Sequence, residues 1–204
     1  MLKVKFKSKR NKIFDTLRGI AFILMIIHHI YYFRIFKCLP YQIPAWVEIS
    51  GIISRNIFII LNGFISTKYN SKFGIIFINA IIISFYSYIF LPKQNFIYMG
   101  VLHYLFLASF TFKILKNYPK IILILGYLSY IFKDVNINLI NYPADIFIPS
   151  KWFYKSVIGY LLAKILFYIP NISKSIFNID KLGKHSLSLY TLHMGLFMFL
   201  QNRF

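Results

Sequence analysis

Acidic residues and cysteine are both scarce in this sequence. Five Asp and Glu residues stand against 24 Lys and Arg residues among 204, which gives a formal net charge of +19. Cys38 is the single cysteine, so an intramolecular disulfide is excluded, while the redox compartment stays open. The sequence also has no repeat of fixed period and no low-complexity tract. These absences exclude a disulfide-stabilised scaffold and a repeat protein.

Hydrophobic residues, in contrast, are abundant and occur in long runs. They account for 58% of the chain, aromatic residues account for 20%, and the mean hydropathy is +0.63. Soluble domains of this size are less apolar, and the runs are long enough to span a bilayer. We therefore predict an all-α, polytopic transmembrane helix bundle.

The basic residues lie between the hydrophobic runs rather than on one amphipathic surface. This placement is typical of membrane proteins, whose Lys and Arg residues contact phospholipid headgroups and follow the positive-inside rule. We therefore expect membrane lipids, and not nucleic acid, as the partner of the positive charge. Residues 1–12 carry six of these basic residues and form a predicted cytoplasmic arm, which precedes a single transmembrane domain at 13–204.

The hydrophobic segments indicate about seven spans, of which the fifth is short. They cover residues 14–34, 47–67, 73–91, 97–115, 120–132, 152–169 and 184–201. With a cytoplasmic N-terminus, the inner segments carry fourteen basic residues and the outer segments carry six. Because cytoplasmic loops are enriched in Lys and Arg, this bias supports the orientation. We expect a multi-pass protein of the cell membrane, with the loop at 133–151 and the C-terminus outside.

Ionisable residues form a stripe along one face of the first span. Arg18 and His29 are eleven residues apart and fall within about 20° of each other, and Asp15 lies about 60° from Arg18. The helical rise separates Arg18 from His29 by about 16 Å, so the stripe joins the cytoplasmic side to the outer half of the bilayer. His28 is rotated by about 80° from Arg18. Since such residues are costly in hydrocarbon, we interpret the stripe as the lining of a reaction path.

Three histidines are expected at one depth near the outer side. His28 and His29 end the first span there, and His103 begins the fourth span. His193 lies on a face of the last span that is expected to pack inward. For this residue a hydrogen-bonded role in the core is favoured over a catalytic role.

The second span carries another polar stripe, and the longest outer loop carries a carboxylate. Glu48, Arg55 and Asn62 are spaced by seven residues and fall within about 40° of one another. For Arg55, a functional role is weighed against a structural ion pair with Glu48. Asp145 belongs to the stiff, proline-containing loop at 133–151, where it either stands over an outer cavity or is a solvated turn residue.

Four sequence blocks, taken in order, resemble a known family. They are Asp15-Thr16-Leu17-Arg18-Gly19-Ile20-Ala21 with Leu24-Met25 and a histidine, Asn56-Ile57-Phe58 through Leu61-Asn62-Gly63-Phe64, Gly100-Val101-Leu102-His103-Tyr104, and Leu182-Gly183-Lys184-His185-Ser186-Leu187 with Tyr190 and His193. The set resembles the catalytic domain of heparan-alpha-glucosaminide N-acetyltransferase and its prokaryotic relatives. The first span also resembles the wider transmembrane acyltransferase superfamily, whose signature is an Arg and a His separated by ten residues, as Arg18 and His29 are. The lysosomal members have more transmembrane helices and a luminal extension, and Lys151 stands where a proline is expected before Trp152.

The resemblance implies acyl transfer from cytoplasmic acyl-CoA, with acetyl-CoA expected, to a sugar hydroxyl or amine of an acceptor across the membrane. A neutral imidazole can act as the base or carry the acyl group, and His29 is the candidate. Arg18 and Asp15 are the candidates for the coenzyme A site, where the guanidinium pairs with a phosphate or holds the carboxylate. Three further residues are candidates for orienting the imidazole or stabilising the thioester oxyanion: His103, Arg55 and Asp145.

Two other classes of protein compete with an acyltransferase. A small polytopic transporter would use the same buried Arg, His and Glu residues as a solute or proton path, although spans one to three do not resemble spans five to seven. A metal or haem protein would use the histidines, but the sequence has neither paired-helix ligand spacing nor an H-x-x-E-H motif, so no metal site is expected. The acceptor and a homo-oligomeric state stay open.

Overall fold

The structure is a computed structural model that describes residues 12–36, 38–40, 42–69, 73–92, 97, 100–132, 149–166 and 179–201. All regular secondary structure in these ranges is helical, which confirms the predicted all-α class. The elements are α1 (Lys12–Tyr32), α2 (Ala45–Lys68), α3 (Phe73–Phe90), α4 (Val101–Ile114), the 3-10 turn η2 (Leu115–Asn117), α5 (Pro119–Ile131), α6 (Pro149–Ile165), α7 (Ile179–Lys184) and α8 (Ser186–Gln201).

Every predicted hydrophobic segment overlaps one helix of the structure, with bounds that differ by a few residues. Among the described residues, α1, α2 and α3 are long and apolar enough to cross a membrane, and α5 is a shorter apolar helix. The short helix α7 was not predicted, because its six residues include three charged ones and carry no hydrophobic run. The predicted cytoplasmic arm, apart from Lys12, and residues 133–148 of the outer loop lie outside the described residues.

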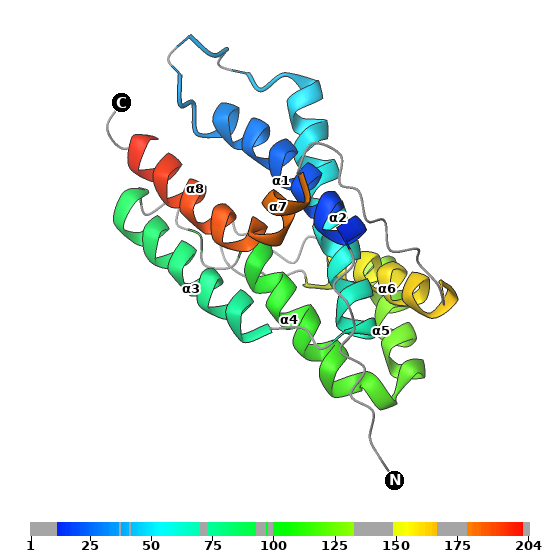
Figure 1. The fold of residues 1–204 in the computed structure, drawn as a ribbon. Helices are drawn as coiled ribbons and strands as arrows, with labels where there is room; N and C mark the ends of the chain where they lie inside the picture. The colour runs from blue at the N-terminus through cyan, green and yellow to red at the C-terminus, as the bar shows by residue number, and fades with distance from the viewer. Residues whose placement is uncertain are drawn as a thin grey trace.

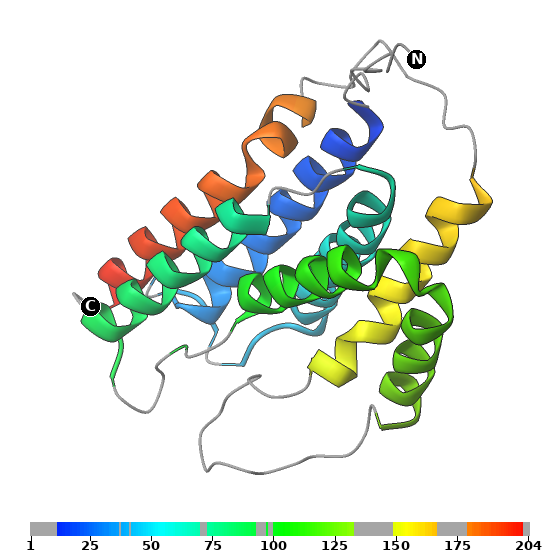
Figure 2. The same ribbon diagram turned by 90° about the horizontal axis from the view of Figure 1, so that it is seen from below.

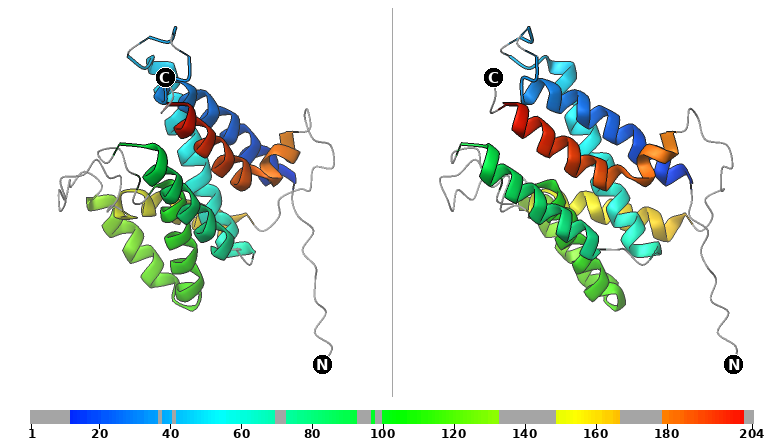
Figure 3. Two further views of the ribbon diagram at one scale, coloured as in Figure 1. Left: turned by 90° about the vertical axis from the view of Figure 1, so that its left-hand side faces the viewer. Right: turned by 60° about the vertical axis from the view of Figure 1, so that its left-hand side comes forward.

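The helices pack around α8 and α2. In Figures 1 and 3, α8 lies between α1 and α3. Helix α2 packs against α1 on one side and against α4 and α6 on the other, and α5 covers α6. Figure 2 shows α1, α3 and α8 together in one half of the bundle and α4, α5 and α6 in the other. Because α2 contacts both halves, a side chain on α2 can reach the interior of either.

Contacts at matching depths show in which direction neighbouring helices run. Helices α2 and α6 are parallel. Lys155 Nζ, in the first half of α6, donates to Asn56 Oδ1 in the middle of α2, and Lys68 Nζ, at the end of α2, donates to the carbonyl oxygen of Leu166 just after α6. The same holds for α3 with α8 and for α2 with α4. Helix α3 is antiparallel to α4, and α5 is antiparallel to α6. The helices predicted as odd spans thus run one way and those predicted as even spans run the other.

Polar contacts lie between the helices of the bundle, and many large apolar side chains lie exposed on its outer surface. Asn62 joins α2 to α4, because its Nδ2 donates to the carbonyl oxygen of Leu105 at 3.1 Å and its Oδ1 accepts from Ser109 Oγ at 2.8 Å. On the outer faces of α3 and α5, large side chains such as Phe85 and Tyr127 are more than half exposed. A surface of this kind favours hydrocarbon over water as its surroundings.

Candidate active site

One face of α1 carries the predicted stripe into the interior. Asp15, Met25 and His29 are buried along it, and the side chain of Arg18 is 24% exposed. Their spacing of three, four and seven residues keeps them on one side of the helix. The burial therefore agrees with the helical face that the sequence predicts.

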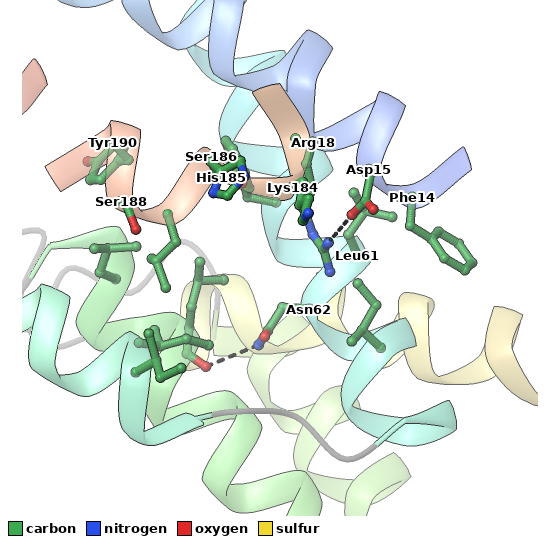
Figure 4. Close-up of a pocket in the computed structure, with 18 of the residues that line it drawn as sticks. Phe14, Asp15, Arg18, Leu61, Asn62, Lys184, His185, Ser186, Ser188 and Tyr190 are labelled. Atoms are coloured by element: carbon green, nitrogen blue, oxygen red, sulfur yellow. Dashed lines mark hydrogen bonds and ion pairs between the residues drawn. The ribbon is translucent and has the colours of Figure 1, made fainter. Parts of the chain in front are cut away.

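A cluster of basic residues lies at the N-terminal end of this face of α1. Arg18 Nη1 donates to Asp15 Oδ1 at 2.7 Å, so the predicted Arg18–Asp15 pair is present. Lys184 and His185, at the junction of α7 and α8, line the same cavity as this pair, and Figure 4 shows them beside Arg18. An anionic group that enters here meets a guanidinium, an ammonium and an imidazole within one opening. We call Arg18, Lys184 and His185 the cationic mouth.

Close packing of α7 on α1 assembles this mouth. A β-carbon at Gly183 would overlap the carbonyl oxygen of Asp15, so only glycine allows the two backbones to approach this closely. The approach places Lys184 and His185, which follow Gly183 directly, next to the first turns of α1. The short helix that the sequence did not predict is therefore what brings the second half of the mouth to Arg18.

Behind the mouth lies a cavity of about 650 Å³. Its walls come from α1, α2, α3, α4 and α8 and are mostly aliphatic or aromatic: Phe14, Met25, Phe58, Leu61, Ile65, Ile75, Ile76, Val101, Leu102, Leu105 and Leu187, with the polar Asn62, Tyr69, Ser186, Ser188 and Tyr190. Sites for small molecules have volumes in this range and the same mixture of apolar walls and few polar groups. The cavity suits an extended ligand with an anionic end at the mouth and a less polar end deeper inside.

A pair of buried histidines, His29 and His193, lies next to Tyr190, one of the residues that line the cavity. Tyr190 lines the cavity, and its ring centroid lies 6.0 Å from that of His29 and 5.2 Å from that of His193. His29 Nδ1 and His193 Nε2 are 2.8 Å apart and share a hydrogen bond. The exposed fractions of the two residues are 8% and 9%. Tyr190 thus separates the cavity, which neither histidine lines, from an imidazole pair that is screened from solvent.

His103 lies elsewhere in the bundle. Its Nδ1 accepts a hydrogen bond from the backbone N–H of Gly100 at 3.1 Å, and its Nε2 lies 3.3 Å from Ser84 Oγ. These contacts hold the first turn of α4 against α3. Both ring nitrogens of His103 are therefore engaged away from His29, and no contact between the two histidines occurs in the described part of the chain.

Arg55 does not line the cavity and interacts with residues outside it. Its guanidinium carbon is 5.2 Å from the ring centroid of Trp152, and it interacts electrostatically with His28. Its Nε is buried without a hydrogen-bond partner among the described residues, and within those residues it forms no ion pair with Glu48. The structural pairing considered for Arg55 is thus not the one observed. Asp145 lies outside the described residues.

Sequence reasoning missed three residues that the structure adds to the site: Lys184, His185 and His193. The inward face of the last span was a usable signal for His193, which was expected to be buried and hydrogen-bonded, as it is. Its partner could not be read from any local pattern, because the two histidines are 164 positions apart. In the sequence, Lys184 and His185 have the pattern of ordinary residues at a membrane interface. Only the packing of α7 on α1 shows that they lie beside Arg18.

The fold and the site together define a class of protein: a helical, apolar bundle with an inner cavity that has a cationic mouth and lies next to a buried imidazole pair. The family follows from a match between residues 10–195 and the model for heparan-alpha-glucosaminide N-acetyltransferase, catalytic. The chain belongs to this family, which implies acetyltransferase activity in an integral membrane protein. Comparisons with curated proteins and with solved structures gave no match.

Proposed function

We propose that this protein transfers an acyl group, with acetyl expected, from cytoplasmic acyl-CoA to a sugar or glycan acceptor on the extracytoplasmic side. The observation that supports this most directly is the cavity that holds the cationic mouth and Tyr190, whose ring lies beside the pair formed by His29 and His193. Coenzyme A carries phosphates at one end and its thioester at the other, joined by a thin arm. The order of chemical groups along the cavity matches that order.

The donor would bind with its phosphates at the mouth. Arg18, Lys184 and His185 supply hydrogen-bond donors there, and charge-assisted hydrogen bonds to phosphate are among the stronger polar contacts in proteins. The pantetheine arm would lie along the apolar walls, and Asn62 offers an amide at mid-depth. This pose brings the thioester toward Tyr190 and His29, where water is excluded.

His29 would act as the general base of a direct transfer. The acceptor oxygen or nitrogen attacks the thioester carbon while His29 takes its proton. The C–S bond then breaks, and the imidazolium returns the proton to the leaving thiolate, which departs as free coenzyme A.

If His29 attacks the thioester instead, the acyl group rests on its ring before it reaches the acceptor. Arg55 and Asp145 stay proposed as residues that orient the imidazole or stabilise the oxyanion from the outer side, and His103, which makes no contact with His29 within the described residues, stays proposed for the oxyanion only.

We also propose seven spans with a cytoplasmic N-terminus in the cell membrane. The alternating directions of the helices and the excess of basic residues in the inner segments support this topology. In a Cys38→Ser background, Ile140→Cys should react in intact cells with a membrane-impermeant maleimide, and Ser71→Cys should react only after the cells are opened. Labelling of position 140 from the cytoplasmic side alone would overturn the orientation.

The decisive experiment for the activity is thiol release from acetyl-CoA by the full chain in lipid nanodiscs. A glucosaminide is the acceptor probe, and free thiol is measured with and without it. We expect acceptor-dependent release that His29→Gln abolishes. If no thiol appears with acetyl-CoA under any acceptor tested, the acyltransferase proposal fails, and the buried polar path would be tested next as a solute route in sealed vesicles.

A further inference from the structure

The contacts of His193 determine where its own proton lies. His193 Nδ1 is 3.1 Å from the carbonyl oxygen of Leu189, one turn earlier in α8. A carbonyl oxygen only accepts hydrogen bonds, so Nδ1 must carry the hydrogen. In a neutral imidazole, the other nitrogen then has a lone pair and accepts. His193 Nε2 is therefore an acceptor.

A charged His193 does not fit its surroundings. Its ring centroid lies 5.4 Å from those of both Phe22 and Phe197 and 5.2 Å from that of Tyr190. No carboxylate among the described residues contacts the ring. An imidazolium there would lose its hydration without gaining a counter-charge, which is costly. The neutral ring is the form that the site accommodates.

The acceptor role of His193 Nε2 and the neutral state of its ring together determine the tautomer of His29. His193 Nε2 accepts, so His29 Nδ1, which is 2.8 Å away, must donate. A neutral His29 with its hydrogen on Nδ1 keeps a lone pair on Nε2. We propose that His193 is a positioning residue that holds His29 in the Nδ1–H tautomer and leaves His29 Nε2 as the nitrogen that meets the substrate. This inference rests on the proposed acyl transfer and names the atom that performs it.

The arrangement also supports the charged state that His29 passes through during transfer. When Nε2 takes the proton of the acceptor, Nδ1–H becomes part of an imidazolium and its hydrogen bond to His193 becomes charge-assisted and stronger. His193 keeps its own proton on Nδ1, which donates to the carbonyl oxygen of Leu189 throughout, so no proton moves between the two rings. In this it resembles the carboxylate of a hydrolase triad, which orients its histidine without becoming protonated.

The first test reads the tautomer directly and needs no turnover. The full chain is labelled with ¹⁵N-histidine, placed in nanodiscs and examined by long-range ¹H–¹⁵N correlation, with His29→Asn used to assign the signals. We expect His29 to be protonated on Nδ1 in the unmodified protein and to shift toward the Nε2–H form in His193→Leu. His29 found as the Nε2–H tautomer in the unmodified protein would overturn the inference.

The second test compares two replacements of similar size. In His193→Gln the amide oxygen can still accept from His29 Nδ1, whereas in His193→Leu the acceptor is gone and the volume is kept. We expect His193→Leu to lower kcat for thiol release by about 100-fold and His193→Gln to keep kcat within about tenfold of the unmodified protein. Equal losses in the two variants, with unchanged tautomer, would reduce His193 to a packing residue.

The two tests separate this inference from the proposed function. If acetyl-CoA releases no thiol but His29 shows the Nδ1–H tautomer, the proposed function fails and the tautomer assignment stands. If thiol is released and the tautomer is the opposite one, the function stands and the role of His193 is wrong. The His29 tautomer is measured in the unmodified protein, so the assignment can be tested even if His193→Leu does not fold.

Discussion

His28 and His29 are adjacent in sequence and lie in opposite environments. His29 is buried between α1 and α8, and its Nδ1 is bonded to His193. His28 is half-buried, stacks on Tyr32 with ring centroids 5.9 Å apart, and has a buried Nδ1 without a hydrogen-bond partner among the described residues. One ring thus belongs to a satisfied internal pair, while the other lies at the seam between α1 and α2.

The difference shows how a rotation of about 100° along a helix separates two chemically identical residues. Helix α8 offers His29 an acceptor at hydrogen-bond distance, whereas α2 offers His28 the bare backbone of Gly51 and the charge of Arg55. The rotation of His28 away from the Arg18 face thus places its ring against α2. The proposed catalytic role of His29 rests on its neighbours, since either imidazole has the same intrinsic chemistry.

The sharpest way to break this comparison is to remove each imidazole in turn. His29→Gln should lower the rate of thiol release by about 10² to 10⁴ or more, because a general base or acyl acceptor is lost. The matched change His28→Gln should keep most of the activity. The rates are measured with acetyl-CoA in nanodiscs, together with the melting temperature of each variant.

The melting temperatures serve as the control for this pair. Both variants should melt close to the unmodified protein, since glutamine fills most of the imidazole volume. An active His29→Gln protein together with a dead His28→Gln protein would assign the step to the seam between α1 and α2. A dead His103→Gln protein beside an active His29→Gln protein would move the step to α4 instead.

The next effect in size concerns the other end of the same face of α1. Arg18→Lys should raise KM for acetyl-CoA by about tenfold and change kcat little, because an ammonium replaces a planar guanidinium that contacts Asp15 and is proposed to bind phosphate at the same time. Arg34→Lys makes the same change beyond the opposite end of α1 and should leave KM unaltered. An unchanged KM in Arg18→Lys would leave Arg18 with a topological role only.

The positions of the helices were largely predictable, and the assembly of the site was not. Runs of apolar residues locate each long helix within a few residues, since hydrocarbon requires them. The face of α1 with Arg18 and His29 followed from helical geometry alone. The residues opposite that stripe depend on packing between distant segments. Gly183 allows α7 to pack closely on α1, and His193 on α8 contacts His29. Neither contact has a local signature.

His103 shows the same limit from the other direction. Its predicted depth near the outer side gave it a place beside His29, but depth does not fix the direction in which a side chain points. Its ring caps the first turn of its own helix through Gly100 and contacts Ser84 on α3. A histidine two or three residues into a helix that starts with glycine is therefore as compatible with capping as with catalysis, and the sequence offers no way to separate the two.

The smallest effect is expected from a change at Gly51, where α2 packs closely against the His28 ring of α1. A β-carbon at Gly51 would lie 2.5 Å from His28 Cδ2 and 2.7 Å from His28 Cγ. Gly51→Ala must therefore displace the His28 ring or part α1 from α2, and overpacking of this kind costs about 1 to 3 kcal/mol. We expect the melting temperature to fall by roughly 2 to 10 °C. Thiol release should stay within about twofold, because His29 and His193 contact each other on the far side of α1.

Gly74→Ala is the control for this change. Gly74 belongs to α3, and a β-carbon there meets nothing within 4 Å. The same substitution should keep or raise the melting temperature, because alanine is favoured over glycine inside a helix by about 1 kcal/mol. If Gly51→Ala abolishes thiol release while His28→Gln does not, the position of α1 relative to α2 controls the His29 pair. The two environments would then be mechanically coupled, and the contrast between adjacent histidines would no longer account for the choice of His29.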